Sequence, residues 1–191
     1  MNILIFSIFL NTIILAVIYF SSKEKNNKSK LIMYFGIFIG ISSLSFNFLF
    51  KSCFGASTPI DIKTENLTKQ NLKIYGISFF EDYGNGNGNN VEYNTELKPN
   101  ETSEFCIDSD GGKFWIVAKN RENEIIYLEE TENKKTNFKI IEKQKTKFTE
   151  SEIAKELTFK KDKSVEFENY LIWTNIILIF LLVLNCFKKP K

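Results

Sequence analysis

The chain has 191 residues with 25 basic residues, 23 acidic residues and no histidine, so its formal net charge at pH 7 is +2. Without histidine the commonest general base and zinc ligand is absent, which argues against a hydrolytic triad or a zinc site. The total hides two parts of opposite sign: residues 51–169 carry 18 basic and 22 acidic residues, whereas the flanking segments carry seven lysines and one glutamate. The acidic middle argues against nucleic acid as a partner.

Three windows of the sequence contain no Asp, Glu, Lys or Arg, and they lie at 3–20, 31–50 and 171–187. Each is close to the roughly 20 residues that a helix needs to cross a hydrocarbon core about 30 Å thick. We therefore predict an integral membrane protein with transmembrane helices at 3–20, 31–50 and 170–187. Buried helices of a soluble protein are the alternative, but such helices rarely run so long without a charge. A cleaved signal peptide fits the first window poorly, because neither a basic start nor a small-residue cleavage site flanks it.

Lysines beside the predicted spans indicate which side of the membrane each connection occupies. Basic residues in short loops are retained in the cytoplasm during insertion. The loop 21–30 and the tail 188–191 are both basic, so both are expected in the cytoplasm. Three crossings satisfy these two requirements and place the amino terminus outside, residues 51–169 outside and the carboxyl terminus inside. The lysines that carry this prediction are Lys23, Lys25, Lys28 and Lys30 in the loop and Lys188, Lys189 and Lys191 in the tail.

A few small and polar residues interrupt the apolar windows. Gly36 and Gly40 form a G-x-x-x-G pattern, which lets a second helix backbone come close, so the second span is predicted to be the packing hub. Asn47 and Asn175 are expected at similar depth near the outer end, where their amides can form a hydrogen bond between spans two and three. Asn11 lies near mid-membrane and should face a partner helix, because an unpaired amide there is unfavourable. The lack of intramembrane charge argues against a transporter.

Residues 58–148 alternate between apolar and polar positions in short runs separated by turn residues. Such runs predict six or seven short strands, arranged as a small antiparallel sandwich or barrel. After them, the sequence TESE at 149–152 has the form of a capping box and predicts a short helix. The charged segment 160–164 is then expected to be a hinge before the third span. The apolar strand positions, in chain order, are Ile60 and Ile62; Tyr75, Ile77 and Phe79; Val91, Tyr93 and Leu97; Phe105 and Ile107; Phe114, Ile116 and Ala118; Ile125 and Tyr127; and the run 137–141.

Two glycine-containing runs resemble ligand-binding loops but lack the rest of the pattern. The run GNGNGNN at 84–90 lies between two predicted strands, without the lysine and following helix of a phosphate loop, so a hairpin loop is the better interpretation. The run DSDGG at 108–112 offers oxygen ligands, yet the twelfth position from Asp108 is Lys119 and the flanks are strands. We therefore expect a tight turn there and no calcium site.

Three cysteines are distributed over both sides of the predicted membrane. Cys53 and Cys106 fall outside, where a disulfide can persist, whereas Cys186 falls at the inner face and should stay reduced. A Cys53–Cys106 bridge is one open alternative, because a single pair has no diagnostic spacing. The acidic neighbours Glu81–Asp82 and Glu129–Glu130 are interpreted as surface charges, since glycosidase chemistry needs two carboxylates across a cleft.

The sequence favours a non-catalytic protein, and it predicts no catalytic residue, metal site or cofactor. We expect the extracytoplasmic β-domain to bind another membrane or envelope protein, as an accessory subunit of a membrane complex or as an immunity-like or sensory module. Trp115 and the pair Phe79–Phe80 are candidate contact residues. The alternative is a membrane effector, in which ligand binding drives helix association through Gly36 and Gly40 and disrupts the bilayer. The oligomeric state stays open.

Overall fold

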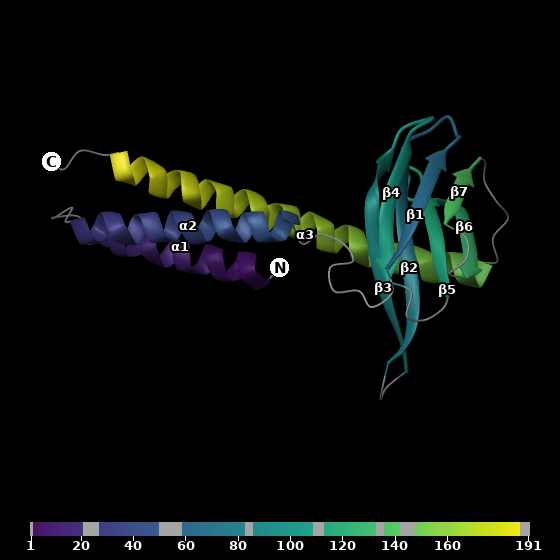
Figure 1. Ribbon diagram of the computed structural model, residues 1–191, viewed down its shortest axis with the longest axis horizontal. Coiled ribbons are helices and arrows are strands. Elements are labelled where there is room, and N and C mark those ends of the chain that lie inside the picture. Colours follow the sequence, from purple (N-terminus) through teal and green to yellow (C-terminus); the bar gives the residue numbers. More distant parts are fainter. Residues whose placement is uncertain are drawn as a thin grey trace. The chain divides into compact units, whose positions relative to one another are not determined.

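The computed structural model describes residues 2–20, 27–49, 59–82, 86–108, 113–132, 136–141 and 148–187 (Figure 1). The chain forms two compact units. The helical unit consists of Met1–Lys51 with Ser164–Lys191, and the β unit consists of Ser52–Lys163.

The helices that the structure describes are α1 (Asn2–Phe20), α2 (Asn27–Leu49) and α3 (Phe148–Phe187). Each contains a stretch long and apolar enough to cross a membrane. Most of their large apolar side chains lie on the surface of the chain, for example Phe9 at 65%, Phe38 at 67% and Phe180 at 59% exposure. Helices in lipid have this distribution, because hydrocarbon tails solvate apolar side chains as well as a protein interior does.

Two helix boundaries differ from the sequence-based expectation. Helix α2 begins at Asn27, so part of the predicted lysine loop, including Lys28 and Lys30, is helical. The predicted hinge at 160–164 is wrong as a break in secondary structure, because these residues lie within the single helix α3. The short helix expected after 149 is therefore the first part of α3. Its first residues, to Lys163, belong to the β unit and the rest belongs to the helical unit.

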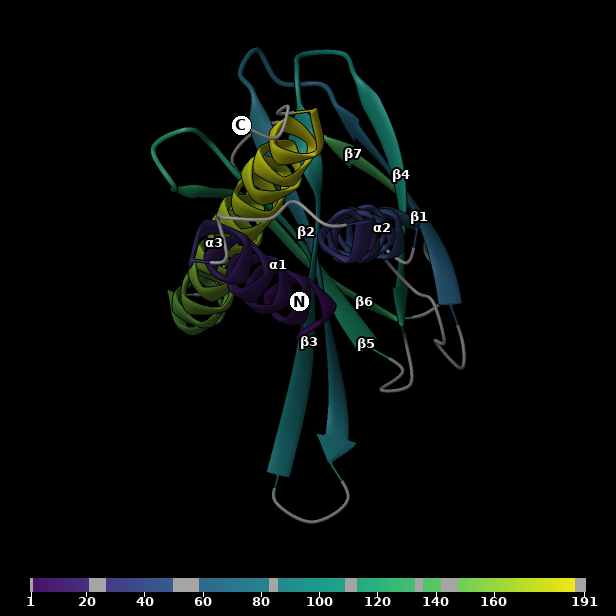
Figure 2. The same cartoon turned by 90° about the vertical axis from the view of Figure 1, so that its left-hand side faces the viewer.

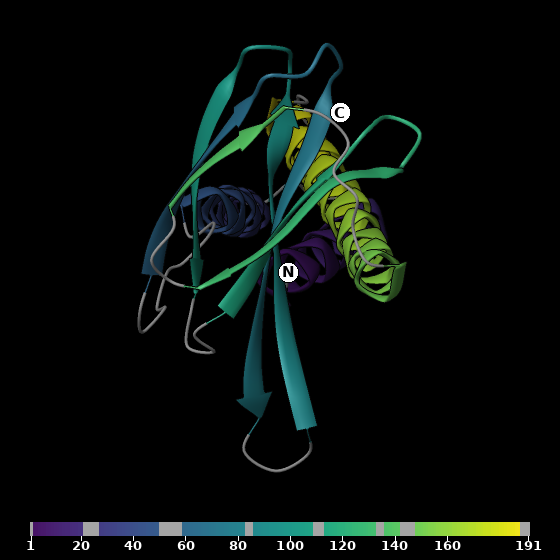
Figure 3. The ribbon, with the colours of Figure 1, turned by 90° about the vertical axis from the view of Figure 1, so that its right-hand side faces the viewer.

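Among the residues that the structure describes, the β unit contains seven strands in two sheets, which agrees with the prediction of six or seven. A three-stranded sheet has the order β4-β1-β7 and a four-stranded sheet has the order β3-β2-β5-β6 (Figures 2 and 3). The parallel pairing of β1 with β7 corrects the purely antiparallel prediction, whereas the other pairings are antiparallel. The strands are β1 (Pro59–Asn66), β2 (Leu72–Asp82), β3 (Gly86–Leu97), β4 (Thr102–Asp108), β5 (Lys113–Lys119), β6 (Ile125–Glu132) and β7 (Asn137–Ile140).

The four-stranded sheet is buried on both faces. Its inner face packs against the three-stranded sheet through side chains such as Ile74, Ile116 and Ile107. Gly76 permits this close approach, because a Cβ there would lie 2.6 Å from Ile107 and 2.9 Å from Phe105. Its outer face packs against the first part of α3. The side chains of this outer cluster are Tyr75, Ile77, Trp115, Val117, Leu128 and Ala154, with Phe79, Val91, Tyr93, Ile125 and Leu157 at its margin.

This second cluster corrects two expectations. Alternation predicted one apolar face for β5, but every residue from Phe114 to Lys119 is buried. The helix on the outer face explains the difference, since a strand covered on both sides needs no polar face. Residues from Gly86 onward of the predicted loop 84–90 belong to β3 and pair with β2. The hairpin is therefore present, with a longer second strand than expected.

Candidate functional site

Buried polar side chains gather at two places, one in each unit. In the helical unit they form the polar seam, which we define as Ser7 and Asn11 of α1, Gly36, Gly40 and Ser43 of α2, and Asn175 of α3. The buried positions of α1 and α2 recur at intervals of three and four residues, which places them on one face of each helix. The seam is the face along which the three helices meet.

Asn175 connects all three helices through its amide group. The amide nitrogen donates to the Ser43 hydroxyl at 2.9 Å and to the Gly40 carbonyl at 3.2 Å. The amide oxygen accepts from the Ser7 hydroxyl at 3.1 Å, and Ser43 donates to the Gly40 carbonyl at 2.8 Å. Asn175 and Ser7 are fully buried. Every polar atom of the Asn175 side chain therefore has a partner, as burial of an amide requires.

Gly36 and Gly40 lie where the other two helices approach α2 most closely. A Cβ on Gly40 would lie 2.6 Å from the Ile179 side chain and 3.1 Å from the Asn11 amide nitrogen. A Cβ on Gly36 would lie 2.7 Å from the Asn11 amide oxygen and 3.1 Å from Leu182. These separations are shorter than van der Waals contact, so both positions require glycine, which has no side chain. The structure thus brings together four of the predicted packing residues, Gly36, Gly40, Asn11 and Asn175.

Asn11 is the exception to the satisfied polar network. Its side chain is fully buried beside the two glycines, yet both its amide nitrogen and its amide oxygen lack a hydrogen-bond partner among the described residues. Asn11 faces neighbouring helices, as the sequence predicted, but it gains no hydrogen bond from them. The predicted Asn47–Asn175 bond lies outside the described part of the structure, because the Asn47 side chain is not described. Asn175 uses Ser7, Ser43 and Gly40 instead.

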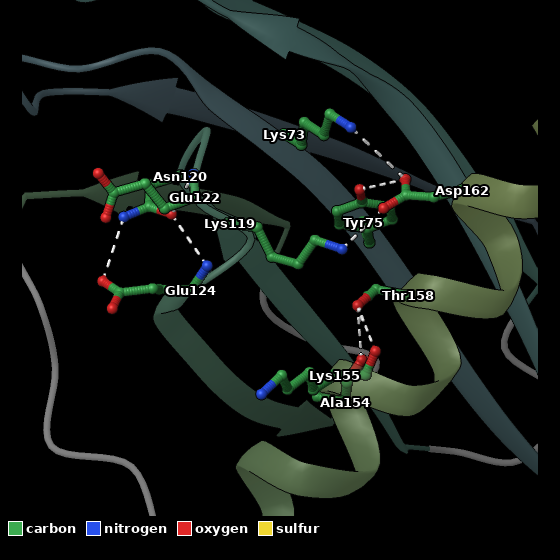
Figure 4. Close-up of polar contacts among 10 residues, drawn as sticks. All are labelled: Lys73, Tyr75, Lys119, Asn120, Glu122, Glu124, Ala154, Lys155, Thr158 and Asp162. Atoms are coloured by element: carbon green, nitrogen blue, oxygen red, sulfur yellow. Dashed lines mark hydrogen bonds and ion pairs between the residues drawn. The ribbon is translucent and has the colours of Figure 1, made fainter. Parts of the chain in front are cut away.

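In the β unit, Asp162 of α3 holds a buried cationic side chain. Lys119, at the end of β5, is 1% exposed and its ammonium group lies 2.8 Å from the Asp162 carboxylate (Figure 4). The Tyr75 hydroxyl donates to the same carboxylate at 2.6 Å, and Lys73 approaches it at 3.9 Å. Lys119 also lies 5.0 Å from the centre of the Tyr75 ring. Burial, and then the bond to Asp162, raises the pKa of Tyr75 well above its ordinary value.

This Asp162 cluster explains why a charged segment is helical. Within the run 160–164, Asp162 is hydrogen bonded to the sheet, whereas Lys160 pairs with Glu156 on the exposed side of α3 at 2.6 Å. Lys161 reaches Glu92 of β3 at 3.7 Å. The charges that suggested a hinge in sequence therefore bind the first part of α3 to the four-stranded sheet.

A shallow hollow of about 360 Å³ lies between α3 and the turn that joins β5 to β6. Asn120 shapes this turn, because its side-chain oxygen accepts from the backbone N–H groups of Glu122 and Glu124 (Figure 4). The hollow contains both charges and exposed apolar groups and has no converging set of catalytic side chains. It is lined by Lys119, Asn123, Glu152, Ile153, Lys155, Glu156 and Phe159.

Four of the aromatic and acidic residues singled out from the sequence, Phe79, Trp115, Glu129 and Glu130, have structural roles. Trp115 is 8% exposed, its ring centre lies 4.7 Å from that of Phe79, and its indole nitrogen donates to Glu130 at 3.1 Å. This burial corrects the expectation that Trp115 is a contact residue. Glu129 accepts a hydrogen bond from Tyr127, so the two neighbouring carboxylates are used separately and do not face each other across a cleft.

The remaining predicted residues lie mostly in the parts that are not described. Cys106 is disulfide-bonded. Its predicted partner Cys53 is outside the described residues, so that pairing stays a prediction. Cys186 lies in the helical unit, with its sulfur 3.9 Å from that of Met33. Lys23, Lys25, Lys188, Lys189 and Lys191 also lie outside the described ranges.

Within the described residues, no group of three or more His, Cys, Asp or Glu side chains is arranged to hold a metal ion. Comparison of the chain with known proteins found no matching family model, no matching curated protein and no matching solved structure.

Proposed function

We propose that the protein is a non-catalytic membrane protein whose β unit lies outside the cytoplasm and binds a partner protein there, in the manner of an accessory subunit or a sensory module. The single observation that carries this proposal is that the residues of the polar seam contact one another within the chain. Every small or amide residue predicted for helix packing and described in the structure already contacts another helix of the same chain.

A bundle whose small and polar residues are occupied internally is suited to anchoring a domain. The alternative membrane effector needs Gly36 and Gly40 to associate with a further helix. A Cβ at either position would already come within 3.1 Å of Asn11, Ile179 or Leu182, which leaves no room for another backbone. The seam therefore favours the anchored binding protein over the effector.

The β unit has the properties of a domain made for recognition. It has its own core between the sheets and a second cluster under α3, so it has the apolar burial of an independent folded unit. The disulfide at Cys106 agrees with an oxidising compartment, where such bonds persist. The positive charges at 21–30 and 188–191 support the same orientation.

The first experiment tests where the β unit lies. In a Cys186→Ser background, Glu122→Cys places a thiol in the exposed turn between β5 and β6, and Lys25→Cys places one in the basic loop. We expect a membrane-impermeant maleimide to label Glu122→Cys in intact cells and to label Lys25→Cys only after permeabilisation. The Cys186→Ser parent without an added cysteine, treated in the same way, measures the background labelling. The reverse pattern would overturn the orientation.

The second experiment tests partner binding in the native membrane. A photo-activatable amino acid replaces Lys69 or Asn89, both exposed on the β unit, or Phe38, exposed on α2 as a control. We expect a discrete protein adduct from at least one β-unit position and none from position 38. Adducts confined to position 38 would show that the bundle, and not the β unit, carries the interaction.

A further inference from the structure

The hairpin formed by β2 and β3 is longer than the sheet to which it belongs. Ser78 is the last residue of β2 that pairs with β5, opposite Phe114, whereas the pairing of β2 with β3 continues to Asp82 opposite Gly86. Beyond Ser78 the hairpin is therefore a two-stranded ribbon, which we call the arm, comprising Phe79–Asp82 and Gly86–Asn89. Figures 2 and 3 show it projecting past the other strands of the β unit.

The outer edge of the arm offers backbone hydrogen-bonding groups. β3 ends the four-stranded sheet and pairs with β2 alone among the strands that the structure describes. Every second N–H and C=O of an edge strand points away from its neighbour. Natural edge strands are usually protected by lysine, proline or a covering element. The stretch from Gly86 to Val91 contains no charged residue and no proline, and Asn89 and Asn90 are exposed.

A ribbon of only two strands gains little stability in water, whereas a third strand adds a ladder of hydrogen bonds. The arm is attached firmly at its base, where the Phe79 ring packs edge-on against Trp115 and Val91 lies opposite Ile77. A strand added beside β3 would place alternate side chains next to this apolar margin. Such an arrangement favours apolar residues at every second position of the added strand.

The charges of the hairpin distinguish between possible occupants. From Ile74 to Leu97 the sequence has four acidic residues and no lysine or arginine. Glu92 and Glu96 have cationic partners within the β unit, Lys161 and Arg121, each at 3.7 Å. The other two, Glu81 and Asp82, belong to the arm itself and give it a net charge of −2. A second copy of the arm would be repelled, whereas a basic segment would be attracted.

We propose that the edge of β3 from Gly86 to Val91 is a strand-addition site for an extended segment of the partner protein, in which apolar residues alternate with lysine or arginine. This inference rests on the proposed function and specifies its binding surface. The backbone ladder provides the affinity, and the apolar margin and the acidic arm select the sequence.

The test uses the full-length protein in detergent and a peptide of about eight residues in which valine alternates with lysine. A matched peptide alternates valine with glutamate. We expect the lysine peptide to bind and to slow amide hydrogen exchange in Gly86–Val91, and the glutamate peptide to bind at least about tenfold more weakly. Binding of the lysine peptide without protection of Gly86–Val91 would reveal nonspecific adsorption and overturn the proposal.

Paired proline variants test whether the backbone of the edge is the binding group. Successive N–H groups of β3 point to opposite sides, so one of Asn89→Pro and Asn90→Pro removes an outward donor and the other removes a donor to β2. The variant that keeps wild-type thermal stability should lose about tenfold in affinity for the lysine peptide. Wild-type affinity in that variant would overturn the proposal. If both variants unfold, the hydrogen-exchange result decides.

The outcomes separate this inference from the proposed function. Concentration-dependent protection of Gly86–Val91 without peptide would identify a second copy of the chain as the occupant and overturn the partner-strand proposal. Photo-adducts from Lys69 together with no peptide binding would leave the proposed function standing and refute the arm as the site. The absence of any adduct from the β unit would refute the proposed function itself.

Discussion

The two units of this chain differ in the kinds of residue that form their interiors. The interior of the helical unit contains serine, asparagine and glycine beside a small apolar cluster around Ile14, Met33 and Leu182, while most of its large aromatic and aliphatic side chains lie on the surface. The interior of the β unit is mainly isoleucine, leucine and phenylalanine; apart from the buried Lys119–Asp162 pair, charged pairs such as Lys63–Glu104 lie on its surface. The same chain thus inverts its pattern between one unit and the next.

The proposed membrane location of the helical unit explains the inversion. In water, burial of apolar area provides about 25 cal/mol for each Å², so the β unit places its apolar residues inside. In lipid there is no such gain, and helices associate through close packing and hydrogen bonds between them. The polar seam supplies both, with close contact at Gly36 and Gly40 and hydrogen bonds at Asn175. A single hydrophobicity rule therefore cannot identify the cores of both units.

The largest predicted effect comes from removing Asp162. Its loss leaves Lys119, whose side chain is 2% exposed, as a buried charge without its carboxylate, and Tyr75 without its acceptor. Breaking a buried ion pair from one side typically destabilises by about 3–5 kcal/mol, so Asp162→Ala should lower the free energy of unfolding of the β unit by about that amount. Chemical denaturation followed by Trp115 fluorescence, in a Trp173→Phe background, measures it.

Two controls sharpen the Asp162 result. The double variant Lys119→Met with Asp162→Leu removes both charges, and we expect it to recover most of the lost stability. Glu156→Ala removes an exposed carboxylate from the same helix and should leave the transition unchanged, because exposed pairs contribute little. A stability of Asp162→Ala equal to that of the wild type would show that the cluster does not hold α3 on the sheet.

The second prediction concerns the helical unit and uses a matched pair on α2. Gly40→Leu forces a side chain into Ile179, whereas Ser42→Leu adds the same side chain on the exposed side of the helix. We expect Gly40→Leu to destabilise the bundle by about 1–3 kcal/mol, as overpacking does, and Ser42→Leu to have little effect. Denaturation in mixed micelles, followed by Trp173 fluorescence in a Trp115→Phe background, compares them. Equal effects would mean that the seam is not the packed face.

The third prediction contrasts two buried asparagines of the same seam. Asn175→Leu removes the bonds to Ser7, Ser43 and Gly40 and should lower the stability of the bundle by about 1 kcal/mol. Asn11→Leu removes an amide without partners and should leave the stability unchanged or raise it, because leucine has a similar shape and needs no hydrogen bond. The same micelle assay tests the difference in sign. Destabilisation by both variants would mean that Asn11 is hydrogen bonded in the membrane.

Much of the fold follows from local pattern alone. The uncharged windows predicted three helices long and apolar enough to cross a membrane, and the structure has them. Alternation predicted six or seven strands, and the interval between Gly36 and Gly40 indicated the face on which helices meet. Each of these patterns depends on residues that are close together in the sequence, so it can be recognised from the sequence alone.

What could not be predicted depends on partners distant in sequence. Lys119 looked like the polar end of a strand, and Asp162 looked like one charge in a hinge, until the helix placed them 2.8 Å apart. Nothing in the sequence around Lys119 indicates that it pairs with Asp162, which lies 43 residues away. The parallel pairing of β7 with β1 could not be predicted for the same reason, because the sequence of a four-residue strand does not indicate the direction of the strand beside it.

The smallest predicted effect concerns the pH dependence of the β unit. Burial raises the pKa of Tyr75, Tyr93 and Tyr127 above the ordinary value near 10, and hydrogen bonds to Asp162 and Glu129 add to it for the first and third. Because the folded pKa is raised, the resulting stabilisation is fully present below pH 10 and declines as the pH rises further.

Absorbance at 295 nm should therefore show these tyrosines ionising only above the pH at which they ionise in the denatured chain. Lysines also titrate in this range, so the slope of stability against pH must be compared between the wild type and Tyr127→Phe, which lacks one of the raised groups but keeps the lysines. We expect a shallower loss of stability above pH 10 in Tyr127→Phe. Equal slopes would mean that the Tyr127 hydroxyl reaches water, and the β unit would then be less tightly closed than its buried core indicates.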